Sequence, residues 1–241
     1  MPATDATRLA VLIDSDNTTA SLTTELLEEI AKYGTPTIKR AYGDWTTPQL
    51  AGWKKELLRH AIQPMQQFAY TRGKNSTDSA LIIDAMDLLY AGNVEGFVIV
   101  SSDSDFTRLV TRLREAGMTV YGIGRRSTPP AFVSACDRFV YLELLKDEPQ
   151  AEGEPAPKRP NLKKLLSTAI SSTSKDDGWS NLAEVGSFLV KNNAAFDARD
   201  YGKSKLGELV RAQPYVKVKD VPGPSGLNTV WVQLNGAARA R

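Results

Sequence analysis

The stretch GFVIVSSDSD (residues 96–105) joins an unbroken apolar run to a group of hydroxyl and acidic residues. A second run of the same kind, LAVLI (residues 9–13), ends at Asp14. Continuous apolar runs of this length are typical of strands that are buried on both faces of a sheet. The two runs therefore predict a sheet that is covered on both sides, with acidic residues where its strands end.

Segments with helical periodicity alternate with strand-like segments around these two runs. We expect helices at 25–32, 48–60, 77–90 and 106–116, and further strands at 37–42, 62–69, 118–123 and 139–142. Strands that alternate with helices predict a parallel sheet in a doubly wound α/β fold. The ligand site of such a fold lies outside the carboxyl ends of the strands.

A proline-rich segment, DEPQAEGEPAPKRP (residues 147–160), separates this pattern from a different one. It contains four prolines and no apolar periodicity, so we expect a flexible linker between domains at 1–146 and 161–241. Beyond it, the pattern predicts helices and then strands, at 162–170, 182–190, 203–212, 215–219 and 229–234. Three helices followed by a hairpin are the outline of a small α+β winged-helix domain.

Composition limits the chemistry that is open to these 241 residues. The single cysteine, Cys136, excludes a disulfide framework and a cysteine-rich zinc site, and the single histidine, His60, argues against a histidine metal cluster. No apolar window approaches a membrane span or a secretory signal, so we expect a soluble, cytoplasmic protein. Residues 1–150 carry a net charge of −3 and residues 151–241 carry +5, which favours nucleic acid as a partner of the second half.

Acidic residues are expected to converge at the carboxyl edge of the predicted sheet. Asp14 ends one buried strand, Asp103 and Asp105 follow the other, and Asp78 lies at the amino end of the 77–90 helix. Crowded carboxylates repel one another unless a cation lies between them, and Mg²⁺ or Mn²⁺ suits oxygen ligands. Such a site fits hydrolysis of a phosphate ester, in which the metal activates water.

A purely structural role is the alternative for each of these residues taken singly. Asp78, Asp103 or Asp105 could cap the helix that follows it, and Asn17 could close an Asx turn. Capping does not explain why two apolar strands both end in aspartate.

Three blocks, LIDSDN (12–17), KNSTDSALIIDAM (74–86) and VIVSSDSDF (98–106), resemble in order and spacing the NYN domain, a PIN-like nuclease domain. The resemblance covers roughly residues 8–145. It implies a Rossmann-like sheet with an acidic divalent-metal site that cleaves RNA.

Carried over by position, the resemblance implies that Asp14, Asp78 and Asp103 are catalytic metal ligands and that Asp105 is a further acidic member. It also implies that Asn17 helps to position metal or phosphate. Asp84 lies six residues after Asp78, so it faces elsewhere on the helix and is expected to be a supporting or structural residue.

Basic and polar residues near this edge are expected to hold an RNA backbone. The expected substrate-binding residues are Asn17, Arg72, Lys74, Ser101, Ser102, Arg125 and Arg126. A solvated loop is the alternative for each lysine or arginine. The aromatic residues Tyr42, Trp45 and Tyr70 stand near strand ends, where they could stack on bases.

Residues 162–235 resemble the OST-HTH domain, which is also named LOTUS. The resemblance lies in the 162–170 helix, in Trp179 and in the run FDARDYGKSKLGELVRAQPYVKV (196–218). It implies a winged helix that binds RNA or, in some members, a protein partner. Lys203, Lys205 and Arg211 would line one helix or its start as a phosphate-binding face, and a solvated helix face is the alternative.

Two other enzyme classes match parts of the same sequence. Residues 14–18, DSDNT, fit the DxDxT pattern of haloacid-dehalogenase-like phosphatases. That family also requires a lysine between its Ser/Thr strand and its last acidic motif, but no lysine stands between Ser101-Ser102 and the acidic pair that follows. The DSD at 103–105 resembles a Toprim motif, yet the first strand ends in aspartate rather than glutamate. The resemblance to the NYN domain, together with the acidic residues, predicts a ribonuclease that depends on Mg²⁺ or Mn²⁺, and a catalytically silent RNA-binding adaptor is the alternative. The exposed edges of the predicted sheet could also mediate a homo-oligomer.

Overall fold

The structure, a computed structural model, describes residues 7–68, 76–145, 159–222 and 228–235. Contacts divide the chain into two compact units, Met1–Pro149 and Gln150–Arg241. Most of the predicted linker, residues 147–158, lies outside the described residues. Within the described parts, no helix combines the length and the apolar character that crossing a membrane requires.

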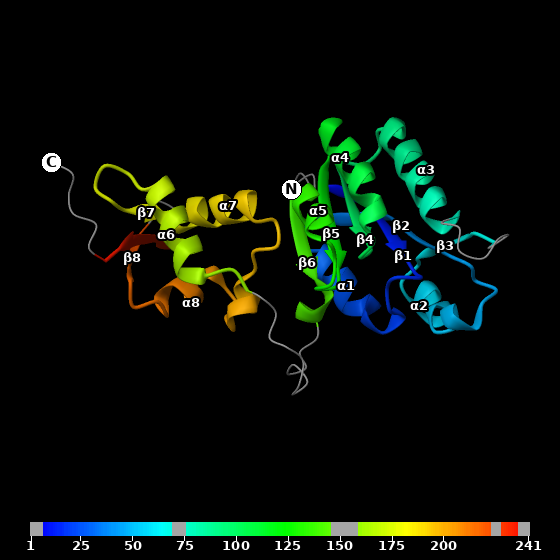
Figure 1. The fold of residues 1–241 in the computed structure, drawn as a ribbon, viewed down its shortest axis with the longest axis horizontal. Coiled ribbons are helices and arrows are strands. Elements are labelled where there is room, and N and C mark those ends of the chain that lie inside the picture. Colours follow the sequence, from blue (N-terminus) through cyan, green and yellow to red (C-terminus); the bar gives the residue numbers. More distant parts are fainter. Residues whose placement is uncertain (1–6, 69–75, 146–158, 223–227, 236–241) are drawn as a thin grey trace. The chain divides into compact units, whose positions relative to one another are not determined.

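In the described residues of the first unit, six strands form a sheet in which every neighbouring pair runs parallel. Their order is β3-β2-β1-β4-β5-β6, and helices lie on both sides of the sheet (Figure 1). The strands are β1 Arg8–Asp14, β2 Thr35–Gly43, β3 Gln63–Gln66, β4 Gly96–Val100, β5 Thr119–Gly124 and β6 Arg138–Tyr141. The predicted parallel α/β fold is confirmed.

The helices of this unit connect successive strands. The α-helices are α1 Thr23–Ile30, α2 Trp53–Arg59, α3 Ser76–Ala91, α4 Thr107–Glu115 and α5 Pro130–Ala135. The 3₁₀ helices are η1 Ala20–Leu22, η2 Pro48–Leu50, η3 Ser104–Phe106 and η4 Leu142–Leu144. The predicted 48–60 helix is therefore two elements, η2 and α2, and α5 was not predicted.

The positions of β1 and β4 in the middle of the sheet explain why their sequences are apolar throughout. Residues 9–13 and 96–100 are buried. Leu9, Val11 and Ile13 belong to a core that includes Leu26 of α1 and Trp53 of α2. Side chains alternate along a strand, so the residues between them point to the opposite face, where α3 packs on β1. Both faces of the strand are covered, and neither can carry polar residues.

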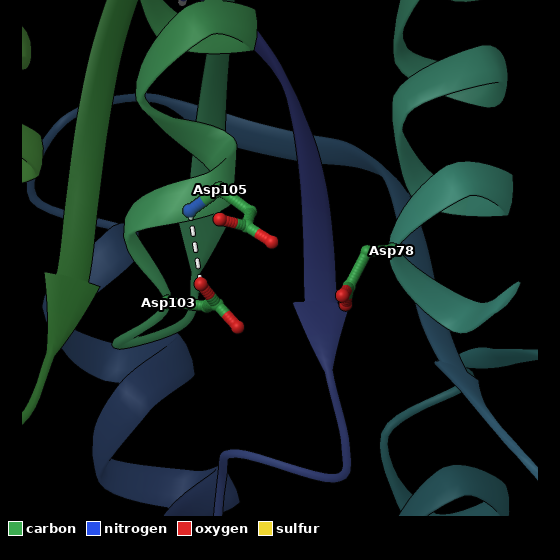
Figure 2. A group of neighbouring side chains, drawn as sticks. All are labelled: Asp78, Asp103 and Asp105. Atoms are coloured by element: carbon green, nitrogen blue, oxygen red, sulfur yellow. Dashed lines mark hydrogen bonds between the residues drawn. The ribbon is translucent and has the colours of Figure 1, made fainter. Parts of the chain in front are cut away.

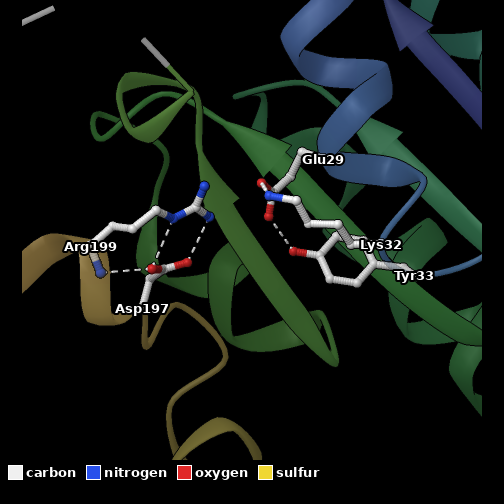
Figure 3. A network of polar contacts seen from close by, with 5 residues as sticks. All are labelled: Glu29, Lys32, Tyr33, Asp197 and Arg199. Atoms are coloured by element: carbon white, nitrogen blue, oxygen red, sulfur yellow. Dashed lines mark hydrogen bonds and ion pairs between the residues drawn. The ribbon is translucent and has the colours of Figure 1, made fainter. Parts of the chain in front are cut away.

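A buried carboxylate is neutralised at the end of α1 (Figure 3). Glu29 is 3% exposed and accepts hydrogen bonds from the Tyr33 hydroxyl at 2.6 Å and the Lys32 ammonium at 2.7 Å. Tyr33 also stacks on Tyr121 of β5, with ring centroids 4.7 Å apart. Because α1 begins at the carboxyl edge of the sheet and runs back along it, these contacts hold the end of α1 against the sheet, away from the carboxyl edge.

The second unit has three α-helices and a small antiparallel sheet in its described residues. Its elements are α6 Leu162–Thr173, β7 Ser180–Asn181, α7 Leu182–Asn192, η5 Ala198–Tyr201, α8 Leu206–Arg211, β8 Val216–Pro222 and β9 Asn228–Leu234. The strand order is β7-β9-β8. Leu166, Val185, Leu209 and Val232 contribute to its core. This arrangement fits the predicted winged helix.

Two local features define where α8 begins. Gly202 has φ 73°, in the left-handed region that glycine adopts without strain, and Lys205 is extended. The helix therefore begins at Leu206 rather than at the predicted residue 203. Just before this point, Asp197 accepts hydrogen bonds from the backbone and guanidinium of Arg199, at 2.7 to 3.0 Å, which fixes the start of η5 (Figure 3).

Candidate active site

The strand order changes direction between β1 and β4. The chain goes from β1 to β2 and β3 on one side and then returns to β4 on the other. Ligands of open α/β sheets bind at such a switch point, outside the carboxyl ends of the strands. Asp14 ends β1 at this point, and residues 101–105 follow β4.

Three carboxylates meet at this edge of the sheet. Asp78, Asp103 and Asp105 each place one carboxylate oxygen within 4.8 Å of the others; we refer to them as the carboxylate group. Asp78 lies in the first turn of α3, Asp103 stands directly before η3, and Asp105 lies within η3. Figure 2 shows the Asp78 side chain extending from α3 toward the other two. Elements that are far apart in the sequence thus bring their carboxylates together.

Asp103 has a capping role as well as a place in the carboxylate group. Its Oδ1 accepts a hydrogen bond from the backbone N–H of Asp105 at 2.9 Å, which caps η3 (Figure 2). A carboxylate with one oxygen used in this way keeps its second oxygen and its charge for a cation. The capping and metal-binding interpretations of Asp103 are therefore compatible.

Asp14 lies behind the carboxylate group rather than in it. It is 1% exposed and accepts hydrogen bonds from the Ser101 hydroxyl and the Asn17 amide, each at 2.7 Å. The Ser101 hydroxyl in turn accepts the backbone N–H of Asp103 at 3.0 Å. Ser101 is also 1% exposed. It is therefore covered and cannot contact RNA, although the sequence predicted that it would. Its hydroxyl instead links Asp14 to the Asp103 loop.

The negative charges of this edge oppose one another. Burial, followed by the charges of Asp14, Asp103, Asp105 and Asp16, raises the pKa of Asp78 to about 6. Burial also raises the pKa of Asp14, although its hydrogen bonds oppose the shift. Raised carboxylate pKa values show that the deprotonated group costs free energy here. A hard divalent cation held by oxygen ligands would relieve that cost, so the donor set fits Mg²⁺ or Mn²⁺.

Asp16 is an acidic residue that the sequence singled out only in the phosphatase-like DxDxT pattern and not among the expected metal ligands. Its pKa is raised by burial and by the charge of Asp14, and its side chain accepts a hydrogen bond from Thr77, the residue before Asp78. The sequence placed Asp16 in the DSDN block, but only contact with α3 shows that it belongs beside the carboxylate group.

Asp84 faces away from the carboxylate group, as the helical spacing predicted. It accepts hydrogen bonds from the guanidinium of Arg40 and the hydroxyl of Tyr42, both on β2. Tyr42 is fully buried, so it cannot stack on a base. These contacts make Asp84 a structural residue that joins α3 to β2.

Replacing Asp84 by Ala is therefore expected to destabilise the first unit without disturbing the carboxylate group. The buried Tyr42 hydroxyl and the Arg40 guanidinium both lose a partner, which costs about 1–3 kcal/mol. Urea unfolding should show this loss, while Mn²⁺ still stabilises the folded variant. A variant with wild-type stability but no response to Mn²⁺ would instead place Asp84 in the metal site.

The basic residues that were predicted to bind substrate have different surroundings. Arg125 is exposed, and its backbone N–H donates to the Ser102 hydroxyl at 2.8 Å, which holds it beside the loop after β4. The Arg126 guanidinium lies over the Tyr141 ring, 4.9 Å from the centroid. Arg72 and Lys74, like Tyr70, lie outside the described residues.

In the second unit, the three predicted cations are not equivalent. Lys203 and Lys205 are exposed and precede α8. Arg211 ends α8 and pairs with Asp220 at 2.6 Å, so part of its charge is already compensated within the unit. The phosphate-binding face proposed from the sequence therefore depends mainly on the two lysines.

The lone cysteine and the lone histidine both have structural surroundings. Burial raises the pKa of Cys136 to about 12, which keeps the thiol protonated. His60 follows the last residue of α2 and lies 3.3 Å from Glu56 and 3.2 Å from the Thr24 hydroxyl. Nucleophilic chemistry by these two side chains does not fit their positions.

The model of the NYN domain matches residues 8–143, more than half of the chain. The chain belongs to the NYN domain family. The model of the OST-HTH/LOTUS domain matches residues 154–227. Both resemblances predicted from the sequence are confirmed, in the predicted order. No curated protein matches the chain.

Solved structures of other proteins are similar to parts of this chain. A protein of unknown function from Vibrio parahaemolyticus is 19% identical, with a TM-score of 0.50, over 58% of this chain and 96% of that one. An uncharacterized protein from Nitrosomonas europaea is 27% identical over 40% of this chain and 92% of its own, with a TM-score of 0.30. A segment of a protein from Chromobacterium violaceum is 27% identical over 34% and 87%, with a TM-score of 0.28.

Proposed function

We propose that the protein is a metal-dependent ribonuclease whose NYN domain hydrolyses RNA phosphodiester bonds at the carboxylate group. The observation that carries this proposal is the meeting of Asp78, Asp103 and Asp105 within 4.8 Å at the switch point of the sheet. These residues would hold Mg²⁺ or Mn²⁺, with the charge of Asp14 behind them. When bound, the cation supplies an activated water and stabilisation of the leaving oxygen.

The remaining residues act by position and charge. Ser101 and Asn17 fix Asp14, and the cap on η3 fixes Asp103. Arg125, exposed at the same edge, would contact an RNA phosphate, as would Arg72 and Lys74. We propose that the OST-HTH/LOTUS domain adds a second RNA contact through Lys203 and Lys205, which raises the local concentration of substrate at the NYN domain.

Chemical reasoning alone supports two parts of the proposal. These are the cellular compartment of the protein and the use of Mg²⁺ or Mn²⁺. A single buried cysteine fits a reducing compartment, so we place the activity in the cytoplasm. Both cations accept carboxylate and water ligands, and a cleavage assay with each of them decides which one supports turnover.

Cleavage of labelled single-stranded and structured RNA by the full-length protein tests the proposal. Parallel reactions contain Mg²⁺, Mn²⁺ or EDTA. Product that forms only with a divalent cation supports a metal-dependent ribonuclease. RNA that binds but stays intact with both cations would instead favour the catalytically silent adaptor.

The raised pKa of Asp78 predicts how metal binding depends on pH. A cation binds the deprotonated carboxylate, so protons compete with it as the pH falls through about 6. Between pH 7.5 and pH 5 we expect the apparent Kd for Mn²⁺ to rise about tenfold. Titration calorimetry over this range measures it, and the weaker binding of Asp78→Asn should vary less with pH. A wild-type Kd that is constant over the range contradicts the prediction.

A further inference from the structure

A pocket of about 650 Å³ is lined in part by Asp16, whose charge acts on Asp78 of the carboxylate group. The loop after β1 forms one wall, from Ser15 to Ser21, and the segment from Gln49 to Glu56 forms the other. Asp16 lines the pocket and accepts a hydrogen bond from Thr77, which precedes Asp78. Asp16 therefore borders both the pocket and the start of α3, and the volume of the pocket is in the range of small-molecule sites.

Two hydroxyl groups in the pocket wall have no hydrogen-bond partner among the residues that the structure describes. Ser15 and Thr18 line the pocket and are 2% and 7% exposed. Neither hydroxyl bonds to any of the described residues. Buried polar groups in proteins are nearly always paired, and a hydroxyl can both donate and accept. An uncharged polar ligand in the pocket would supply partners for these covered hydroxyls after a rotation of their side chains.

The charge and polarity of the other walls narrow the class of ligand. Asp16 and Glu56 are acidic, and none of the described residues that line the pocket is a lysine or an arginine. A phosphate is therefore disfavoured inside it. Leu50 and Trp53, 5% and 2% exposed, give an apolar surface beside the polar one. An uncharged group with an apolar ring face and polar edges fits both surfaces.

We propose that the pocket receives the base and ribose of one nucleotide of the RNA strand, next to the phosphate at the carboxylate group. This inference rests on the proposed function and assigns its substrate a binding position. The carboxylates of Asp16 and Glu56 would accept hydrogen bonds from sugar hydroxyls, of which ribose has one more than deoxyribose. The pocket would thus favour RNA over DNA.

Two substitutions test the pocket in different ways. Gly52 has helical backbone angles (φ −64°, ψ −26°), and a Cβ added there meets only the Ala20 Cβ, at 4.0 Å. Gly52→Leu therefore fills the pocket without backbone strain. Thr18→Val removes one unpaired hydroxyl and keeps the shape of the side chain. Thr111→Val is the matched control, because its hydroxyl lies on α4 and bonds to the Thr107 carbonyl.

Binding of adenosine, guanosine, cytidine and uridine to the full-length protein is measured by NMR titration in EDTA. We expect at least one ribonucleoside to bind the wild type and Thr111→Val equally. Thr18→Val should weaken that binding about threefold, and Gly52→Leu about tenfold or more, with both variants unfolding at the wild-type temperature. No binding of any of the four to the wild type, or equal binding to Gly52→Leu, would overturn the proposal.

The metal-free titration separates this inference from the nuclease itself. Ribonucleoside binding that Gly52→Leu removes, in a protein that never cleaves RNA, would support the pocket and refute the ribonuclease. Metal-dependent cleavage with the same KM in the wild type and in Gly52→Leu would refute the pocket and support the ribonuclease.

Discussion

Asp103→Asn is expected to lower metal-dependent RNA cleavage by about 100- to 1,000-fold. The amide keeps an Oδ1 that accepts the backbone N–H of Asp105, so the cap on η3 is retained. What the substitution removes is one negative charge from the three carboxylates that lie within 4.8 Å of one another. The effect therefore reports on charge at the carboxylate group and not on the fold of the loop.

A time course with labelled RNA and Mn²⁺ measures the effect, with both proteins purified in the same way. Asp87→Asn is the matched control, because Asp87 is an exposed aspartate on α3 outside the carboxylate group. It should cleave at the wild-type rate. Equal cleavage by Asp103→Asn and the wild type would point to a contaminating nuclease or to a site elsewhere on the protein.

The parallel sheet was predictable because its signal is strong and local. Residues 9–13 and 96–100 are buried on both faces, and only an unbroken apolar run satisfies that requirement. The carboxyl edge followed from topology, since parallel strands end on the same side. Elements whose signal is weak were missed, such as α5 with six residues and β7 with two.

The convergence of acidic residues at one edge was predictable, but the arrangement of their side chains was not. Sequence position indicated that Asp14, Asp78 and Asp103 would lie at one edge, but it could not show that Asp14 is covered and bonded to Ser101. The burial of Tyr42 and the contact of Asp16 with Thr77 depend on side chains from separate elements. Such contacts have no signature in the order of residues along one chain.

Asp78→Asn is expected to unfold at a higher temperature than the wild type without metal and at a lower temperature than the wild type with Mn²⁺. At pH 7.5 the pH is above the raised pKa of Asp78, about 6, so the wild-type group is charged although burial and four carboxylates oppose the charge. Asparagine removes that cost, and the variant should unfold at a higher temperature than the wild type in EDTA. With Mn²⁺ at 100 times its Kd, the wild type gains about 2.7 kcal/mol, while the variant has lost a ligand and gains much less.

Calorimetry of both proteins in EDTA and in Mn²⁺ measures this reversal, and Asp87→Asn should follow the wild type in both conditions. The pH dependence has a defined sign. A raised carboxylate pKa means that the folded domain binds more protons than the unfolded chain between pH 4 and 6, so the contribution of Asp78 to metal-free stability falls as the pH rises through that window. The variant should lack this slope. If Mn²⁺ stabilises Asp78→Asn as strongly as the wild type, the cation is held without Asp78, and the carboxylate group is not the metal site.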